Sequence, residues 1–210
     1  ALLLLTFVRT DLLSRWQQTL PSDAPNRFVI NVQPDQLPAV TQFVQDIGLQ
    51  NAQLFPMVRA RLQSVNGKAV TGASYKNNGE RAMRLAEREF NLSSVAEFGK
   101  DNTLVAGKFW SKNHSGALEM SVEQGFAESL NWKLGDVVRF DVAGTKLSAK
   151  ITSFRKIEWE SFKPNFFVVI SPNGLQGLSA SYISALYVPK DKQNKMDDLV
   201  RQFPNLSVID

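Results

Sequence analysis

The fold of this chain is decided by the stretch from Leu134 to Pro172, which reads LGDVVRFDVAGTKLSAKITSFRKIEWESFKPNFFVVISP. In residues 137–142 polar and apolar side chains alternate, with the period of two that is typical of a strand with one buried face. A tight turn is predicted next, because Gly144 can adopt the positive φ that a short hairpin turn requires. The alternation resumes in residues 146–154, so this part of the chain predicts a β-hairpin.

The end of the same stretch predicts a different kind of strand. Residues 166–170, FFVVI, are apolar on both faces and are followed by Ser171-Pro172, which stops the run. A strand without a polar face is typical of a position that is covered on both sides. We therefore expect other elements of the chain to pack on both faces of this strand.

Two distant parts of the chain show the same order of elements. Residues 28–32 and 53–65 predict strands on either side of a helix, which we expect to be capped by Asp35 and to end at Gly48. Residues 182–188 and 206–209 predict strands on either side of a helix that Pro189 opens. The order β-α-β, long insertion, β-α-β predicts an α+β fold with a discontinuous ferredoxin-like subdomain.

The insertion, residues 67–178, is expected to form a second, β-rich subdomain. Besides the hairpin it contains a predicted strand at 103–107 and predicted helices at 80–90 and 121–130. A capping box of Ser121 with Gln124 is expected to begin the second of these helices. In the first helix, Arg81, Arg84, Glu87 and Arg88 are spaced so that ion pairs across one turn are expected.

Short motifs along the whole chain follow one another in a family-specific order. They are Leu20-Pro21, Ala24-Pro25-Asn26, Arg59-Ala60-Arg61-Leu62, Arg88-Glu89-Phe90-Asn91-Leu92, Gly107-Lys108-Phe109-Trp110, Ser121-Val122-Glu123, Leu134-Gly135-Asp136, Phe140-Asp141-Val142-Ala143-Gly144, Arg155, Trp159, Ser161-Phe162 and Pro164-Asn165-Phe166-Phe167. In this order they resemble the extracytoplasmic domain of FtsX/MacB-type ABC transporter permeases, and most closely the YbbP-like group. The resemblance covers nearly the whole chain.

The resemblance implies a fold and a location. Residues 26–66 and 179–210 would form a porter-like, ferredoxin-like subdomain, and residues 67–178 an inserted subdomain similar to the MacB periplasmic core domain. It also implies transmembrane helices before and after this segment, and therefore a periplasmic domain of a bacterial inner-membrane protein.

The resemblance further implies a function without bond chemistry. A cytosolic ABC ATPase subunit would be the partner that hydrolyses ATP, and this domain would relay the resulting motion across the inner membrane. It could also guide a hydrophobic or lipid-like cargo. A free-standing periplasmic module that binds a ligand or a protein is the alternative.

The N-terminal residues 1–8, ALLLLTFV, are too few to cross a bilayer, which needs about 20 apolar residues. From the residues alone, they could begin an amphipathic helix or be the outer end of a transmembrane helix. The resemblance favours the second, so residues 1–25 are interpreted as the end of a transmembrane helix and a stalk helix. Arg15 and Trp16 would lie on this stalk.

Composition excludes several classes of function. The 210 residues carry 24 Lys and Arg and 20 Asp and Glu, a formal net charge of +4. These charges are interleaved, whereas nucleic-acid binding needs a concentrated basic face, so no nucleic-acid partner is expected. Because there is no cysteine, disulfides, thiolate metal sites and cysteine nucleophiles are excluded.

Motifs for catalysis, metal binding or cofactor binding are weak. His114 is the single histidine, so it lacks the histidine or cysteine partners of a metal site. Residues 177–181, GLSAS, come near the G-x-S-x-G motif but lack its second glycine, so a hydrolase using His114 is the least favoured alternative. Glu158 and Glu160 are explained more simply as solvated edge residues than as a glycosidase pair. We expect no catalytic, metal or cofactor site in this chain.

Aromatic residues cluster in the insertion, and most of them are expected to form its core. A minority could instead line an apolar groove for cargo or a partner. The candidates are Trp110, Trp159 and Phe162.

Overall fold

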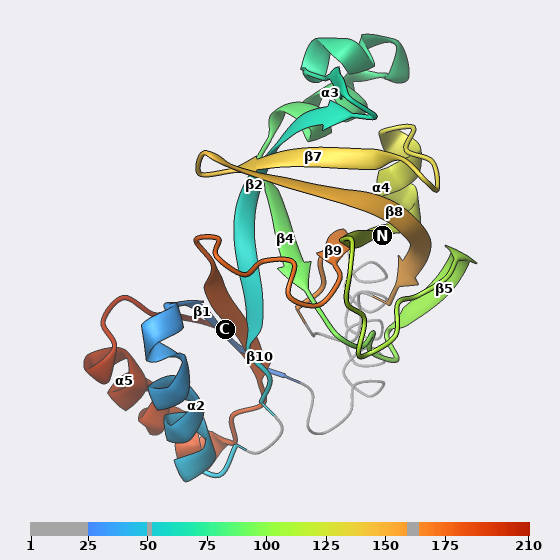
Figure 1. The fold of residues 1–210 in the computed structure, drawn as a ribbon. Helices are drawn as coiled ribbons and strands as arrows, with labels where there is room; N and C mark the ends of the chain where they lie inside the picture. Colours follow the sequence, from blue (N-terminus) through green and yellow to red (C-terminus); the bar gives the residue numbers. More distant parts are fainter. Residues whose placement is uncertain (1–24, 50–51, 159–163) are drawn as a thin grey trace, which may run out of the picture.

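The computed structural model describes residues 25–49, 52–158 and 164–210, which form a mixed α/β fold (Figure 1). The strands are β1 (Arg27–Val32), β2 (Phe55–Val65), β3 (Lys68–Ala69), β4 (Phe90–Ser94), β5 (Asn102–Gly107), β6 (Glu119–Glu123), β7 (Val137–Val142), β8 (Thr145–Ile157), β9 (Val168–Ile170), β10 (Ser181–Leu186) and β11 (Ser207–Ile209). The α-helices are α2 (Leu37–Asp46), α3 (Glu80–Glu87), α4 (Gln124–Ser129) and α5 (Gln193–Gln202), and the 3₁₀ helices are η1 (Pro34–Gln36), η2 (Gly72–Asn78) and η4 (Lys190–Lys192). No helix in these ranges is long and apolar enough to cross a membrane.

The smaller sheet brings the two ends of the described chain together. Its order is β11-β1-β10-β2, and every neighbouring pair is antiparallel. Phe28 of β1 pairs with Ala185 of β10 on one side and with Ile209 of β11 on the other. The prediction that residues 28–32 and 182–188 lie in one sheet is therefore confirmed.

Helices α2 and α5 lie side by side against this sheet (Figure 1). Both helices are amphipathic, and their apolar faces close a small core with β1 and β10. The buried residues of this core are Val29, Val32, Val40, Val44, Leu49, Leu186, Val188, Met196, Leu199 and Leu206.

Strand β2 belongs to both halves of the molecule. Residues 55–57 pair with β10, residues 58–60 pair with β4, and the remainder of the strand pairs with β7. In Figure 1 this strand runs from the smaller sheet to the far side of the larger one. The two sheets are thus joined by continuous hydrogen-bonded backbone as well as by a connecting chain.

The larger sheet continues from β2 through β4, β9, β6 and β8 to the edge strand β5, and β7 closes onto both β2 and β8. The predicted hairpin is confirmed as β7 and β8, with Ala143 at φ 48° and Gly144 at φ 90° in its turn.

The core of this lobe is rich in aromatic rings. Phe90 lies 5.4 Å from Phe140 and 5.6 Å from Phe126, measured between ring centroids.

The doubly covered strand predicted at 166–170 is confirmed for Val168, Val169 and Ile170, which form β9 and are at most 5% exposed, whereas Phe166 and Phe167 precede the strand and are half-buried. It lies between β4, to which it is parallel, and β6, to which it is antiparallel. Neither of these neighbours was predicted as a strand. Both are five residues long, too short to show a clear alternation.

The predicted start of the helix at 121–130 is wrong. Ser121 lies in β6, is fully buried, and its hydroxyl accepts a hydrogen bond from the Ser153 hydroxyl at 2.7 Å. Helix α4 begins at Gln124 and is capped by the carboxylate of Glu123, which accepts hydrogen bonds from the backbone N–H groups of Gly125 (3.0 Å) and Phe126 (2.7 Å). Pairing with β8 and β9 holds residues 119–123 extended, so the cap falls two residues later.

The same cap gives a testable prediction. Glu123→Ala should lower the free energy of unfolding by about 1 kcal/mol, because two N–H groups of the first helical turn lose their acceptor. Urea denaturation of the variant would measure this loss. Glu128→Ala, an exposed position on the same helix, is the matched control. Equal stability of the two variants would contradict the capping role.

Two further sequence predictions concern the smaller lobe. Asp35 was expected to cap the first helix but lies exposed inside η1, and the Gln36 side chain instead accepts a hydrogen bond from the backbone N–H of Gln33 at 3.1 Å. Gly48 has the predicted left-handed conformation, with φ 85°. The end of the helix was therefore read correctly, and its beginning was not.

Candidate functional site

The aromatic residues predicted to line a groove are only partly within the described residues. Trp110 is 7% exposed, and its indole N–H donates a hydrogen bond to the backbone carbonyl of Val95 at 3.0 Å. Its ring lies 4.9 Å from Phe98, which stacks on Phe109 at 3.9 Å. Trp110 thus packs in an aromatic cluster of Phe98, Phe109 and Trp110. Trp159 and Phe162, and the stalk residues Arg15 and Trp16, lie outside the described residues.

A hollow of about 190 Å³ adjoins this aromatic cluster. We call it the Arg155 hollow, since the side chain of Arg155 forms part of its wall. The other lining residues are Gln53, Phe55, Val95, Glu97, Phe98, Gly99, Asp101, Asn102, Pro164, Asn165, Phe166 and Val169. It thus lies where the start of β2 meets the segment between β4 and β5.

Arg155 is the largest fully buried side chain of the described chain and is 1% exposed. Its guanidinium donates hydrogen bonds to the backbone carbonyls of Phe166 and Phe167, the latter at 3.3 Å, while its Nε has no partner among the described residues. These bonds tie the segment that precedes β9 to β8. Arg155 therefore positions backbone at the centre of the larger sheet.

The electrostatics of Arg155 follow from this burial. Burial lowers the pKa of Arg155 from 12.5 to about 10, and the carboxylates of Glu123 and Asp101 raise it in part. A pKa of about 10 still leaves the guanidinium protonated at neutral pH. The hollow therefore contains a permanent positive charge.

A signal for this buried charge was present in the sequence. Along β8 the buried positions are the odd-numbered ones, including Leu147, Ala149, Ile151 and Ile157. Arg155 follows the same alternation, so its side chain is expected to point toward the buried face of the strand. An arginine on the buried face of a strand indicates a buried guanidinium, which must be hydrogen-bonded to acceptors inside the protein.

Both ring nitrogens of His114 contact oxygen atoms of nearby residues. Its Nδ1 lies 3.1 Å from a carboxylate oxygen of Glu119, and its Nε2 lies 3.1 Å from the backbone carbonyl of Ala117. The two oxygens belong to its own loop and to the start of β6, and no hydrogen bond joins His114 to a hydroxyl group of the described residues. The described residues also contain no group of three or more side chains that could hold a metal ion.

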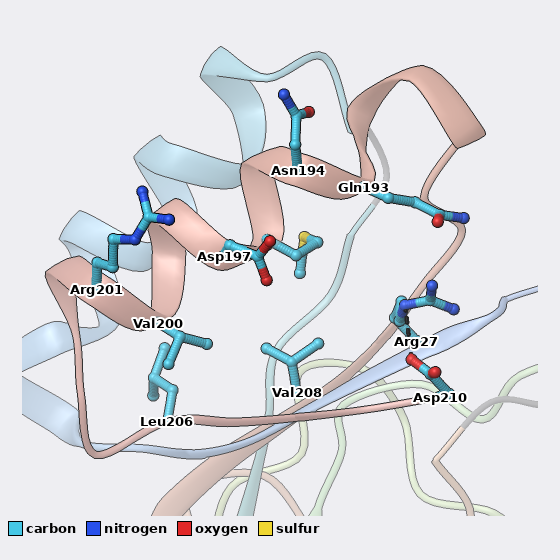
Figure 2. Close-up of a pocket in the computed structure, with 10 residues that line it drawn as sticks. Arg27, Gln193, Asn194, Asp197, Val200, Arg201, Leu206, Val208 and Asp210 are labelled. Carbon is cyan, nitrogen blue, oxygen red and sulfur yellow. Dashed lines mark ion pairs between the residues drawn. The ribbon is translucent and has the colours of Figure 1, made fainter.

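A second, wider hollow of about 790 Å³ lies between α5 and the outer edge of the smaller sheet. Figure 2 shows Val200, Leu206 and Val208 on its floor and the ion pair of Arg27 with Asp210 at one end, where Nε and Oδ1 are 2.9 Å apart. This ion pair joins β1, near the start of the described chain, to Asp210 at its end, next to the pairing of β1 with β11. The hollow is therefore located where both ends of the domain meet.

A third hollow of about 740 Å³ lies between α3 and α4. We call it the α3 hollow; its lining is Arg81, Arg84, Leu85, Glu87, Arg88, Phe126 and Phe167. The prediction of ion pairs across one turn of this helix is wrong, because among the described residues none joins these arginines to a glutamate. The three arginine side chains are exposed.

Comparison with known proteins shows that this chain is similar in sequence to part of a transporter. The chain is 36% identical over 209 residues, its full length, to the Escherichia coli (strain K12) protein described as "Uncharacterized ABC transporter permease YbbP". It spans 24% of the length of that permease, so the match is to one domain of a longer protein. A solved permease domain from Porphyromonas gingivalis is 11% identical and covers 87% of this chain and 87% of its own, with a TM-score of 0.41.

No family model matches the sequence. The predicted likeness to YbbP-like permeases is confirmed by the full-length match.

Proposed function

We propose that this chain, a homologue of one domain of the ABC transporter permease YbbP, is a non-catalytic periplasmic domain that relays ATP-driven motion across the bacterial inner membrane. The similarity to a permease supports a role as a transporter component. The ATPase activity would belong to a separate cytosolic subunit, bound through the rest of the permease. Transmembrane helices of that permease would precede and follow the segment.

The observation that best supports this role is the continuity of β2. One strand pairs first with β10 of the smaller sheet and then with β4 and β7 of the larger sheet. A hydrogen-bonded strand resists bending within the sheet far better than a flexible linker does. A displacement applied to the smaller sheet would therefore move the larger lobe with it.

We assign the smaller sheet and its two helices to a porter-like, ferredoxin-like subdomain of residues 26–66 and 179–210. Its strand order, β11-β1-β10-β2, is the order 4-1-3-2 of an antiparallel β-α-β-β-α-β unit. Residues 67–178 would then be the inserted subdomain, similar to the MacB periplasmic core domain. The inserted subdomain shares β2 with the first, because Val58, Ala60 and Leu62 lie in its core.

The ends of the described chain are suited to receive motion together. Phe28 and Ile209 pair in neighbouring strands, and Arg27 and Asp210 form an ion pair. Helices attached on both sides would consequently act on one edge of one sheet. Residues 1–25, with Arg15 and Trp16, would be the end of one such helix and its stalk.

The lever role can be tested in the full permease together with its ATPase subunit. A short flexible Gly-Ser insertion next to Arg15 is expected to abolish the coupling between transport and ATP hydrolysis, because a flexible segment does not transmit a helix displacement. Proteolysis and circular dichroism of the purified domain should remain unchanged. The same insertion between Ala143 and Gly144, an exposed turn at the end of the β7–β8 hairpin, is the matched control. Coupling that survives the Arg15 insertion would exclude the stalk as a lever.

A hydrophobic or lipid-like cargo is the second part of the proposal. Trp110, Trp159 and Phe162 are proposed to form an apolar surface for this cargo, and the buried Trp110 packs against Phe98, which lines the Arg155 hollow. Titration with a lysolipid should then change tryptophan fluorescence, and the change should disappear in Trp159→Phe. A signal that is flat in the wild-type chain would remove the cargo surface from the proposal.

A further inference from the structure

The α3 hollow combines three features that the proposed motion relay does not use: arginines without ionic partners among the described residues, an apolar floor, and a position remote from both ends of the described chain. Arg81 and Arg84 belong to α3 and Arg88 is its C-terminal cap residue; because they are spaced by three and four residues, they lie on one side of the helix. All three are exposed, and none forms an ion pair with any residue the structure describes.

The helix carries both favourable and unfavourable charges: Glu80 in the first turn and Arg84 in the last turn suit the helix dipole. Like charges at spacings of three and four residues destabilise a helix. Arg81 also stands in the first turn, where the helix dipole disfavours a positive charge. Glu80 and Glu87, four residues before and three residues after Arg84, compensate part of this charge. No ion pair joins the three arginines to any described residue, so their guanidinium groups remain available to a partner from outside.

The floor of the hollow supplies an apolar contact beside the charges. The rings of Phe126 and Phe167 are stacked with centroids 4.9 Å apart and planes inclined by 16°. Leu85 extends this floor from the same helix that carries the arginines. The single acidic residue of the lining, Glu87, packs its side chain toward Gly72 of η2.

The position of the hollow favours a partner from the aqueous phase. Figure 1 shows α3 at the end of the larger lobe opposite the smaller sheet, where β1 and β11 carry the two ends of the described chain. If those ends lead to the membrane, as the proposed function holds, α3 is the part of the domain farthest from lipid. The hollow is also open to solvent, which suits a protein segment more than an enclosed acyl chain.

We propose that the α3 hollow is a docking site for an acidic segment of a partner protein that carries an apolar anchor residue. The guanidinium groups of Arg81, Arg84 and Arg88 would each bind a carboxylate, for which their planar donor fork is suited. The anchor would contact Phe126 and Phe167, as buried apolar residues do at the centre of protein interfaces. The location of this partner in the periplasm rests on the proposed function. The binding of an acidic segment to the hollow rests only on the residues that line it.

The test uses the isotope-labelled 210-residue chain and a short synthetic peptide in which glutamates flank a Leu-Phe core. Addition of the peptide is expected to shift the amide NMR signals of α3 and α4, with an affinity that falls as salt is raised. Combining Arg81→Gln, Arg84→Gln and Arg88→Gln should weaken the affinity at least about tenfold. Arg84→Glu should reverse the preference toward a peptide in which lysines replace the glutamates.

Arg59→Gln combined with Arg139→Gln is the matched control, since both are exposed arginines on strands outside the hollow. The proposal is overturned if this control weakens binding as much as the triple variant does, or if the glutamate and lysine peptides bind wild type equally. It is also overturned if monomeric dodecyl phosphate shifts the α3 signals while the acidic peptide does not, because the site would then be a lipid site. None of these outcomes depends on coupling in the permease, so the lever role is tested separately.

Discussion

Phe140→Ala is expected to lower the free energy of unfolding by about 3–5 kcal/mol, the range for removing a fully buried phenylalanine. Phe140 is 0% exposed and pairs with Leu62 of β2 and Leu147 of β8. Its ring also lies 5.4 Å from that of Phe90. The cavity would therefore open at the point where three strands of the larger sheet meet.

Chemical denaturation followed by circular dichroism measures this loss. Val137→Ala is the matched control, because Val137 stands on the same strand with 42% of its surface exposed and should change stability by less than about 0.5 kcal/mol.

A second measurement on the same variant concerns the connection between the lobes. Because β2 is shared, amide exchange should accelerate in the smaller sheet as well as in the larger one. If the amide protection of β1 and β10 stayed at the wild-type level, the smaller lobe would unfold independently of the larger lobe, and the shared strand would not couple their stabilities.

Arg155→Ala is expected to lower the free energy of unfolding by about 3 kcal/mol. The substitution removes the side-chain donor of the Phe166 carbonyl, leaves the Phe167 carbonyl with the backbone N–H of Glu123 at 2.8 Å, and leaves a void where the buried guanidinium stood. Removing a buried charge offsets part of the loss, since burial already disfavours the protonated form of this side chain. Thermal and urea denaturation measure the net effect.

Two further variants separate the hydrogen bonds from the charge. Arg155→Lys keeps the positive charge but lacks the planar fork, so it should retain part of the stability. Lys156→Ala, at the exposed neighbouring position of β8, should remain within about 0.5 kcal/mol of wild type. A stability of Arg155→Ala equal to that of Lys156→Ala would show that the guanidinium contributes nothing to holding the segment before β9.

The two lobes illustrate how one long strand can organise a discontinuous domain. The smaller sheet closes through pairing between β1, β10 and β11, which come from opposite ends of the described chain. Strand β2 then extends the same hydrogen-bonded network into the larger lobe. In the proposed relay, this shared strand would carry the displacement from one lobe to the other.

The sequence by itself determined the local elements with strong patterns. The alternation in residues 137–154 and the Gly144 turn predicted the β7–β8 hairpin, and the apolar run at 166–170 predicted a doubly covered strand. The order of short motifs also pointed to YbbP-like permeases. These signals are local or linear, because they depend on the spacing of side chains along the chain and not on what contacts them.

Tertiary structure alone decided the elements and contacts that depend on distant residues. The short strand β6 is extended because β8 and β9 pair with it, although Ser121-Val122-Glu123 alone fitted a helix start. A distant segment likewise fixed the partners of Arg155, whose guanidinium donates hydrogen bonds to the carbonyls of Phe166 and Phe167 before β9. A strand pattern fixes which face a side chain takes, but its partner is fixed only when the sheets assemble.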